Sequence, residues 1–304
     1  GALPPADVDA ISTDLRADFI PEGLAWDAER GRFLLGSVHL RRVVSIDPAT
    51  GASRPFAGGM DSLLGMHLSP DGQRLWAAGT SLPQGDAPVN PGRTGLWVMD
   101  AATGRVLGRH GVPIRDEKGN LGDFTFLGEH TLIASDSGTG ALWRYHLDES
   151  RWSPLLPAGS FRSPQGLAPG RQADAVYLAD YSTGIWRIGL DGSRTVLAPP
   201  EGAELRGIDG LYRDGDRLVA IQNGTRVHRI LLLRLAADAE RIDAVDVLAQ
   251  AGEHWIEPTL GTIVGGDFWF VANSQWNRFD AEGRLPPVEQ LVPPRIERLR
   301  LPPR

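Results

Sequence analysis

Short runs of alternating apolar and polar residues, each followed by a turn, recur along the whole chain. The stretch Ser163–Gly192 holds one full copy, with expected strands at Gly166–Ala168, Ala175–Asp180 and Gly184–Ile188. Val, Ile, Tyr and Trp favour a half-buried, pleated backbone, and the Asp-Gly pair at its end favours a chain reversal. The pattern therefore predicts a small antiparallel β-unit.

This β-unit occurs six times when the copies are aligned on their first glycine. The copies begin near Pro21, Leu64, Gly122, Gln165, Ile208 and Thr259. A period of about 45 residues is typical of the blades of a β-propeller. A single blade cannot bury both of its faces, so blades are stable when they stack on their neighbours. We predict an all-β, six-bladed β-propeller in which residues 1–304 form a single domain.

The segments outside the repeat predict how the blades are completed. A strand-like segment, Ala10–Leu15, precedes the first copy, and Ile296–Leu301 follows the last. We expect the N-terminal strand to complete the last blade beside the C-terminal strand, which would hold both chain ends in place. Ala244–Leu248 is the expected outer strand of the fifth blade. The segment Thr80–Thr94 is rich in Pro, Gly and Asn, which predicts a surface loop.

Composition narrows the classes of partner. The 31 Lys and Arg residues are outnumbered by 38 Asp and Glu residues, the formal net charge is −7, and the basic residues do not cluster. We therefore expect no nucleic-acid partner. No apolar run has the length of a membrane span. There is no cysteine, which excludes disulfides and thiolate metal sites. We expect a monomer that binds a small-molecule substrate or ligand.

The first residues, Gly-Ala-Leu-Pro-Pro, suggest a compartment. A start of this kind is typical of a mature chain after removal of a signal peptide. We therefore expect a periplasmic or secreted protein, with a trimmed cytoplasmic protein as the alternative.

One position of the repeat carries the candidate chemistry. In a propeller the first strand of each blade lines the central channel, and the residue before the repeat glycine lies near its mouth. These residues are Glu22, Leu64, Gly122, Gln165, Asp209, and Thr259 or Leu260. Asn120, Asp123 and Glu257 add further oxygen atoms nearby. Oxygen ligands suit a hard divalent cation, although many polar propeller channels hold no metal.

Three repeat starts carry a family resemblance. Pro21–Asp27 (PEGLAWD), Pro164–Ala168 (PQGLA) and Ile208–Tyr212 (IDGLY) resemble those of the gluconolactonase or regucalcin (senescence marker protein) family of six-bladed propellers. The blade pattern covers the whole chain, and the likeness is specific at these starts. The resemblance implies one divalent ion at the channel mouth. Calcium is expected first, and zinc, magnesium or manganese are alternatives.

The resemblance also implies roles for individual residues. Glu22 and Asp209 occupy the positions of two family ligands. Gln165 stands where the family has a ligand Asn, and Gly122 stands where it has an Asn that contacts substrate. A longer Gln would shift the ion, and Gly122 offers no side chain. Asn120 or Asp123 could compensate, although strand alternation would point Asp123 away from the face of residue 122. In a lactonase mechanism Asp209 would be the general base.

Polar residues after the second strand of each copy suggest a substrate funnel. His39, Asn273 and Trp276 depart from the repeat, and functional loops are usually found at such departures. Tyr181 and Trp276 could stack on a substrate, and Asn120 and Asp123 complete the expected substrate-binding set. The alternative is that Asp, Ser and Asn at these positions only satisfy turns.

These observations favour a divalent-metal-dependent lactonase or esterase-like hydrolase of a small lactone or ester. One alternative is a metal-free propeller that binds a ligand or a protein. Another is a non-hydrolytic enzyme resembling strictosidine synthase, in which a carboxylate such as Glu257 is the base. Propellers support many unrelated activities, so the fold does not choose among these classes.

Overall fold

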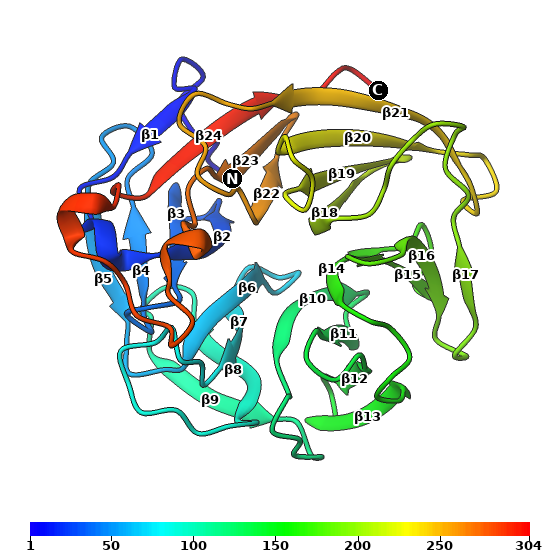
Figure 1. Cartoon of the computed structure of the whole chain (residues 1–304), viewed down its shortest axis with the longest axis horizontal. Helices are drawn as coiled ribbons and strands as arrows, with labels where there is room; N and C mark the ends of the chain where they lie inside the picture. The colour runs from blue at the N-terminus through cyan, green and yellow to red at the C-terminus, as the bar shows by residue number, and fades with distance from the viewer. The chain divides into compact units, whose positions relative to one another are not determined.

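A computed structural model describes residues 1–304 and contains six four-stranded antiparallel sheets that follow one another along the chain (Figure 1). The protein is an all-β, six-bladed β-propeller. The chain divides into two compact units, one made of residues 1–119 and 253–302 and the other of residues 120–252 and 303–304. Each unit carries three blades.

The first unit contains blades 1, 2 and 6. Blade 1 consists of β2 (Pro21–Asp27), β3 (Arg32–Ser37), β4 (Val43–Ile46) and β5 (Ser53–Ala57). Blade 2 consists of β6 (Ser62–Leu68), β7 (Arg74–Thr80), β8 (Thr94–Asp100) and β9 (Val106–Gly111). Blade 6 consists of β22 (Gly261–Val264), β23 (Asp267–Val271), β24 (Arg295–Arg300) and β1 (Ala10–Ser12).

The predicted pairing of the two chain ends is confirmed. Strand β1 pairs antiparallel with β24, with Ile11 opposite Ile296, so the N-terminal strand is the outer strand of blade 6. The predicted surface loop is also found, because β7 ends at Thr80 and β8 begins at Thr94.

The second unit contains blades 3, 4 and 5. Blade 3 consists of β10 (Leu121–Leu127), β11 (Thr131–Asp136), β12 (Leu142–His146) and β13 (Arg151–Leu156). Blade 4 consists of β14 (Pro164–Pro169), β15 (Ala175–Asp180), β16 (Gly184–Gly189) and β17 (Arg194–Val196). Blade 5 consists of β18 (Ile208–Asp214), β19 (Arg217–Gln222), β20 (Arg229–Leu235) and β21 (Ile242–Gln250). The predicted outer strand of blade 5 is therefore present and longer than expected.

Within each unit the apolar faces of neighbouring blades pack together. Between blades 6 and 1, the buried rings of Phe33 and Trp269 lie 5.1 Å apart. Between blades 4 and 5, Tyr177 belongs to a buried cluster that includes Leu211 and Leu231. Alternate residues of a strand point to opposite faces, so an inner strand with apolar residues on both faces packs between two neighbours.

The first strands of blades 1 to 5 share one irregularity that bears on function. Their pairing with the second strand shifts register between residues 21 and 24, 63 and 66, 121 and 123, 164 and 167, and 208 and 211. A bulge of this kind re-aims a side chain out of the regular alternation. The residues inside the shifts include Glu22, Leu64, Gly122, Gln165 and Asp209, which are the repeat positions singled out from the sequence.

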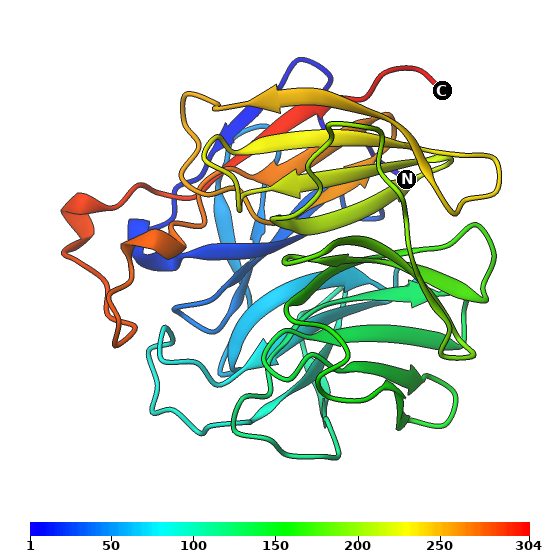
Figure 2. The same ribbon diagram turned by 45° about the vertical axis from the view of Figure 1, so that its right-hand side comes forward.

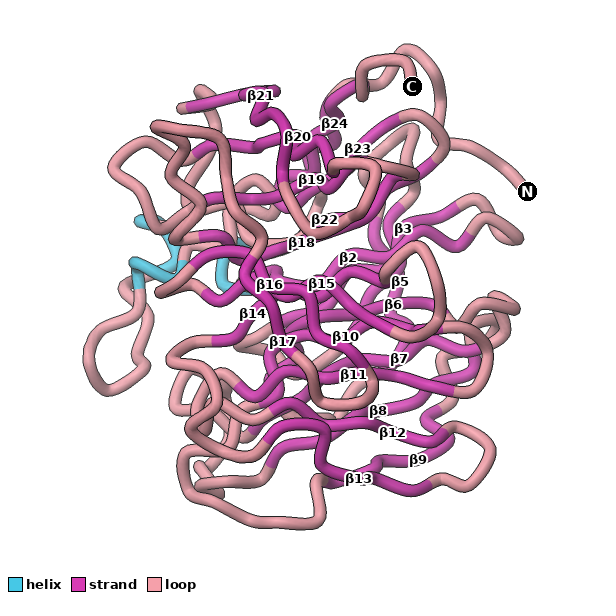
Figure 3. Tube along the Cα trace, turned by 90° about the vertical axis from the view of Figure 1, so that its right-hand side faces the viewer, coloured by secondary structure: helices cyan, strands magenta, loops and turns pink.

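Helical structure is limited to three short 3-10 turns, η1 (Ala17–Phe19), η2 (Trp276–Arg278) and η3 (Val288–Gln290). All three belong to the first unit and lie on the same side of it, as the coiled segments in Figure 2 and the cyan segments in Figure 3 show. None of the helical segments has the length and apolarity needed to cross a membrane.

Candidate functional site

In the first unit, Glu22 is held by a tryptophan from another blade. Glu22 lies in the register shift of β2 and is 6% exposed. Its Oε2 accepts a hydrogen bond of 2.6 Å from the indole Nε1 of Trp276, the first residue of η2. A buried carboxylate needs such partners, because leaving it without them is costly. The bond therefore fixes the orientation of the Glu22 side chain.

The loop that carries Trp276 is itself anchored. Gln275 has a left-handed backbone with φ of 56°. Its side-chain amide donates to the carbonyl of Val292 at 2.8 Å and accepts from the backbone N–H of Val292 at 2.9 Å. Glu257 also holds this loop, because its Oε2 accepts from the backbone N–H of Asn277 at 3.0 Å.

Two more predicted substrate-binding residues lie in this unit, and the first is His39. His39 has its Nδ1 at 2.7 Å from the carbonyl oxygen of Gln84, and its ring lies 6.4 Å from the ring of Phe279. Phe279 in turn lies 5.7 Å from the ring of Trp276. Rings from His39 to Trp276 therefore form a row that ends at Glu22. We refer to His39, Phe279 and Trp276 as the aromatic row.

The second of these residues, Asn273, is fully engaged with the chain that leads into β24. The residue is buried. Its Nδ2 donates to the carbonyl of Pro293 at 2.8 Å, and its Oδ1 accepts from the backbone N–H of Arg295 at 2.8 Å. Both ends of the amide therefore order this segment.

In the second unit, Asp209 ends a chain of hydrogen-bonded side chains. The hydroxyl of Tyr181 donates to Oδ1 of Asn223 at 2.8 Å, and Nδ2 of Asn223 donates to Oδ2 of Asp209 at 3.1 Å. Tyr181 follows β15 and Asn223 follows β19, so the loops after the second strands of blades 4 and 5 converge on Asp209. Asn223 is not among the predicted site residues. Its place in the polar run after a second strand is the only sequence signal of its role.

Gln165 lies next to Gly122. The Nε2 of Gln165 donates to Oγ of Ser163 at 2.9 Å, which fixes the amide plane. A Cβ placed on Gly122 would lie 3.7 Å from Oε1 of Gln165, an ordinary van der Waals contact. The two repeat positions that depart from the resembled family are therefore neighbours, and the longer glutamine reaches the space beside the glycine.

Asn120 and Asp123 flank Gly122 in different ways. The Oδ1 atom of Asn120 is buried and has no hydrogen-bond partner in the structure. Asp123 is buried, and its Oδ1 accepts from the backbone N–H of Phe124 at 2.8 Å. The register shift between Leu121 and Asp123 interrupts the strict alternation of side chains. The expectation that Asp123 points to the face opposite residue 122 assumed a regular strand, so it does not hold here.

The chemistry of these side chains fits a hard divalent cation. Glu22, Gln165 and Asp209 offer carboxylate and amide oxygens, which calcium and magnesium prefer. One atom of each side chain is already tied to a neighbour, and such outer contacts orient metal ligands. No group of three or more His, Asp or Glu side chains is arranged to hold a metal.

The fold is shared with solved structures of several functions. A gluconolactonase from Xanthomonas campestris matches with a TM-score of 0.62 and 13% identity, over 99% of this chain and 98% of that chain. A calcium-binding regucalcin from Agrobacterium tumefaciens matches with a TM-score of 0.65 and 14% identity, over 97% and 95%. The PQQ-bound form of an aldose sugar dehydrogenase from Streptomyces coelicolor matches with a TM-score of 0.63 and 16% identity, over 97% and 100%.

These matches confirm at the level of fold the resemblance predicted from the repeat starts. No protein-family model matches the sequence, and no curated protein does either. Identities this low show the fold alone. Because a hydrolase, a calcium-binding protein and a dehydrogenase share this fold, the function must be argued from side chains.

Proposed function

We propose that this protein is a divalent-metal-dependent, lactonase- or esterase-like hydrolase of a small lactone or ester. The observation that carries the proposal is that the candidate ligand side chains, which offer oxygen atoms, lie at register shifts of the first strands. Glu22, Gln165 and Asp209 all lie in register shifts of first strands, and all are oriented by a side-chain hydrogen bond. Bulges are frequent beside active sites because they re-aim side chains.

In this proposal Glu22, Gln165 and Asp209 supply the ligand oxygens, with calcium as the first candidate ion. A bound divalent ion would supply polarisation of the ester carbonyl and activation of a water molecule. Asp209 accepts the proton of the attacking water at its carboxylate, and Asn223 and Tyr181 keep that carboxylate oriented. Trp276 holds Glu22 in the same way.

The remaining predicted residues are proposed as substrate contacts. The aromatic row offers ring faces beside Glu22, which suit the apolar face of a sugar-like ring. Asn120 is half-buried, and its side-chain amide is proposed to contact a substrate hydroxyl. Asp123, Tyr181 and Asn273 complete the proposed set, and Asn273 contributes by ordering the segment that leads into β24.

The first experiment measures bound metal and thermal stability before and after chelation, together with hydrolysis of a panel of sugar lactones and aryl esters. We expect one divalent ion per chain, a lower Tm after chelation, and lactone hydrolysis that returns when calcium is added. Glu22→Gln and Asp209→Asn should lose metal and activity together. Glu29→Gln, which removes an exposed carboxylate from the same blade as Glu22, is the matched control.

Two results would overturn the proposal. One is a protein that binds no divalent ion and shows no change in Tm with any ion added. The other is metal binding and hydrolysis that survive in both Glu22→Gln and Asp209→Asn.

A second candidate is a metal-free, non-hydrolytic enzyme with Glu257 as base. It is favoured by the unusual backbone of Glu257, whose φ is 62°, and by its contact with the loop that carries Trp276. Backbone strain of this kind is concentrated at functional sites. Activity that resists chelation and is lost in Glu257→Gln would select this candidate. Chelator-sensitive activity that Glu257→Gln retains would reject it.

A further inference from the structure

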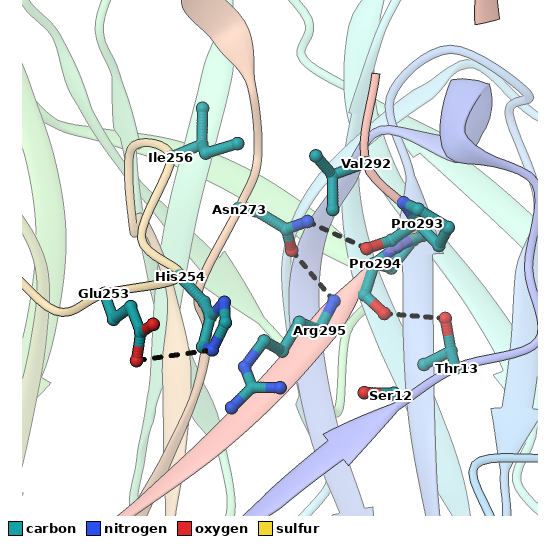
Figure 4. Close-up of a pocket in the computed structure, with 10 residues that line it drawn as sticks. All are labelled: Ser12, Thr13, Glu253, His254, Ile256, Asn273, Val292, Pro293, Pro294 and Arg295. Atoms are coloured by element: carbon teal, nitrogen blue, oxygen red, sulfur yellow. Dashed lines mark hydrogen bonds and ion pairs between the residues drawn. The ribbon is translucent and has the colours of Figure 1, made fainter. Parts of the chain in front are cut away.

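Blade 6 contains a cavity whose lining shares only Asn273 with the residues of the proposed hydrolase. Its volume is about 480 Å³, and it lies where the segment before β24 passes the end of β1 and the segment before β22 (Figure 4). A volume of this size is within the range of small-molecule sites, about 300–1,000 Å³. Its lining includes His254, Ile256, Val292, Pro293, Pro294 and Arg295.

The wall formed by Pro293, Pro294 and Arg295 is held in place by hydrogen bonds. Asn273 binds the carbonyl of Pro293 and the backbone N–H of Arg295, both at 2.8 Å. Thr13 binds the carbonyl of Pro294 through its hydroxyl at 2.7 Å. Two prolines also restrict the backbone of this wall. The cavity is therefore formed before any ligand arrives, which reduces the entropic cost of binding.

The guanidinium of Arg295 is held in place by one hydrogen bond, and its other donors are open to a ligand. Its Nε donates to Oε2 of Glu297 at 2.8 Å, which fixes the plane of the group. Glu297 is held in turn by the indole Nε1 of Trp255 at 3.0 Å. The two Nη atoms of Arg295 make no hydrogen bond to the protein. Figure 4 shows Arg295 and His254 at one end of the cavity, and Ile256 and Val292 at the other.

We propose that this cavity is a binding site for a small monocarboxylate with a short apolar body. The Nη atoms of Arg295 present the donors that a carboxylate accepts, and the His254 ring offers a further nitrogen beside them. Ile256, Val292 and Pro293 provide apolar contact for the rest of the ligand. The cavity has a polar end and an apolar end, which match the carboxylate and the apolar body of such an acid.

The charges around the cavity favour a single negative charge on the ligand. Glu297 already neutralises part of Arg295, and Glu253 lies 3.7 Å from Nε2 of His254. A phosphate dianion would meet both carboxylates and only one guanidinium. A neutral alcohol would leave the Nη donors without a charged acceptor. A monocarboxylate carries one negative charge, which pairs with the guanidinium of Arg295 and is repelled less by Glu297 and Glu253 than a dianion would be.

The test is an NMR titration of the full chain with hexanoate, with hexanol and acetate as comparison probes. Hexanol has the apolar body without the charge, and acetate has the charge without the body. We expect saturable hexanoate binding with Kd below about 10 mM, and at least about tenfold weaker binding of both comparison probes. Arg295→Lys should weaken hexanoate binding about tenfold, because it keeps the charge and loses the planar fork.

Val292→Asp gives a test that does not depend on the ion pair of Arg295. Val292 is 45% exposed, so the substitution places a negative charge at the cavity without disturbing the core, and hexanoate binding should fall at least about tenfold. Val247→Asp, at a site of 47% exposure on β21, is the matched control and should bind like the wild type. The proposal is overturned if hexanoate does not saturate, if hexanol binds equally well, or if Val292→Asp binds hexanoate like the wild type.

Discussion

The indole N–H of Trp276 donates to the carboxylate of Glu22 at 2.6 Å, although the two residues are 254 positions apart in the chain. Glu22 lies in the first strand of blade 1, and Trp276 follows the second strand of blade 6. Blade 6 is completed by β1, from the N-terminal end of the chain. The orientation of a proposed ligand therefore depends on a loop of the blade that joins the two chain ends.

Removing this hydrogen bond should weaken the proposed metal site and leave the fold intact. Trp276→Phe keeps an aromatic ring and deletes the N–H donor to Glu22. Loss of a contact that orients a metal ligand typically costs about 10- to 100-fold in metal affinity, so we expect a fall of about tenfold or more. The measurement is calcium affinity by calorimetry, with the circular dichroism spectrum as the check on folding.

The control for Trp276→Phe is Trp26→Phe, on the same strand as Glu22. The indole of Trp26 donates to the carbonyl of Ala2 instead, so its loss should leave metal affinity unchanged. Equal calcium affinities for Trp276→Phe and the wild type would show that the hydrogen bond from Trp276 does not orient Glu22 for metal binding.

Tyr181 and Asn223 should behave as one unit acting on Asp209. Tyr181→Phe removes the donor to Asn223, and Asn223→Ala removes the donor to Asp209. We expect each single variant to lower kcat by about tenfold with little change in KM. The double variant should lose less than the sum of the two single losses, since Tyr181 acts on Asp209 through Asn223. A double-mutant cycle on kcat and KM measures the coupling between the two residues. Additive losses would show that Tyr181 does not act through Asn223.

Two glycines in neighbouring first strands should respond differently to alanine. A Cβ on Gly166 would lie 2.3 Å from the backbone oxygen of Asp209, whereas one on Gly122 would meet Gln165 at 3.7 Å. We expect Gly166→Ala to destabilise the protein by about 2 kcal/mol, because a backbone atom must move. Gly122→Ala should change the free energy of unfolding by less than about 0.5 kcal/mol. Urea unfolding of both variants provides the comparison.

The buried ion pair at the end of β18 should make stability depend on pH in acid. Burial acts to raise the pKa of Asp214, but hydrogen bonds from Arg217, at 2.6 Å, and from Arg304 hold it below its ordinary value of 3.8. A carboxyl with a depressed pKa contributes stability that is complete above its unfolded pKa. That contribution is lost as the pH falls through the folded pKa.

Asp214→Asn should therefore be destabilised by about 3 kcal/mol at pH 7, because Arg217 is left buried beside a neutral group. The difference in stability between this variant and the wild type should narrow when the pH falls below about 4. Asp216→Asn is the control, because that carboxylate is 77% exposed in its pair with Arg171 and should matter little at either pH. A difference that stays constant between about pH 7 and pH 3 in urea unfolding would contradict the assignment.

Several features of the proposed site can be predicted from the sequence because they follow the repeat. Glu22, Gln165 and Asp209 are selected by their position before the repeat glycine, and the register shifts are found at that position. The role of Asn223 cannot be predicted in this way, because it comes from its hydrogen bond to Tyr181 of the neighbouring blade. The facing expected for Asp123 rests on strict alternation, and the shift at Gly122 breaks that alternation.

The order of residues along the chain is enough to predict the six blades, their strand pattern and the closure of blade 6 by the N-terminal strand. Those features follow from apolar periodicity and turn residues, which act over short distances and repeat along the chain. The folded structure was needed to learn which side chains hold Glu22 and Asp209, and that the Gln165 side chain lies beside Gly122. It was also needed to find that Asn273 shapes a separate cavity around Arg295. Contacts of this kind join residues that are far apart in the chain, and local periodicity carries no information about which residues those are.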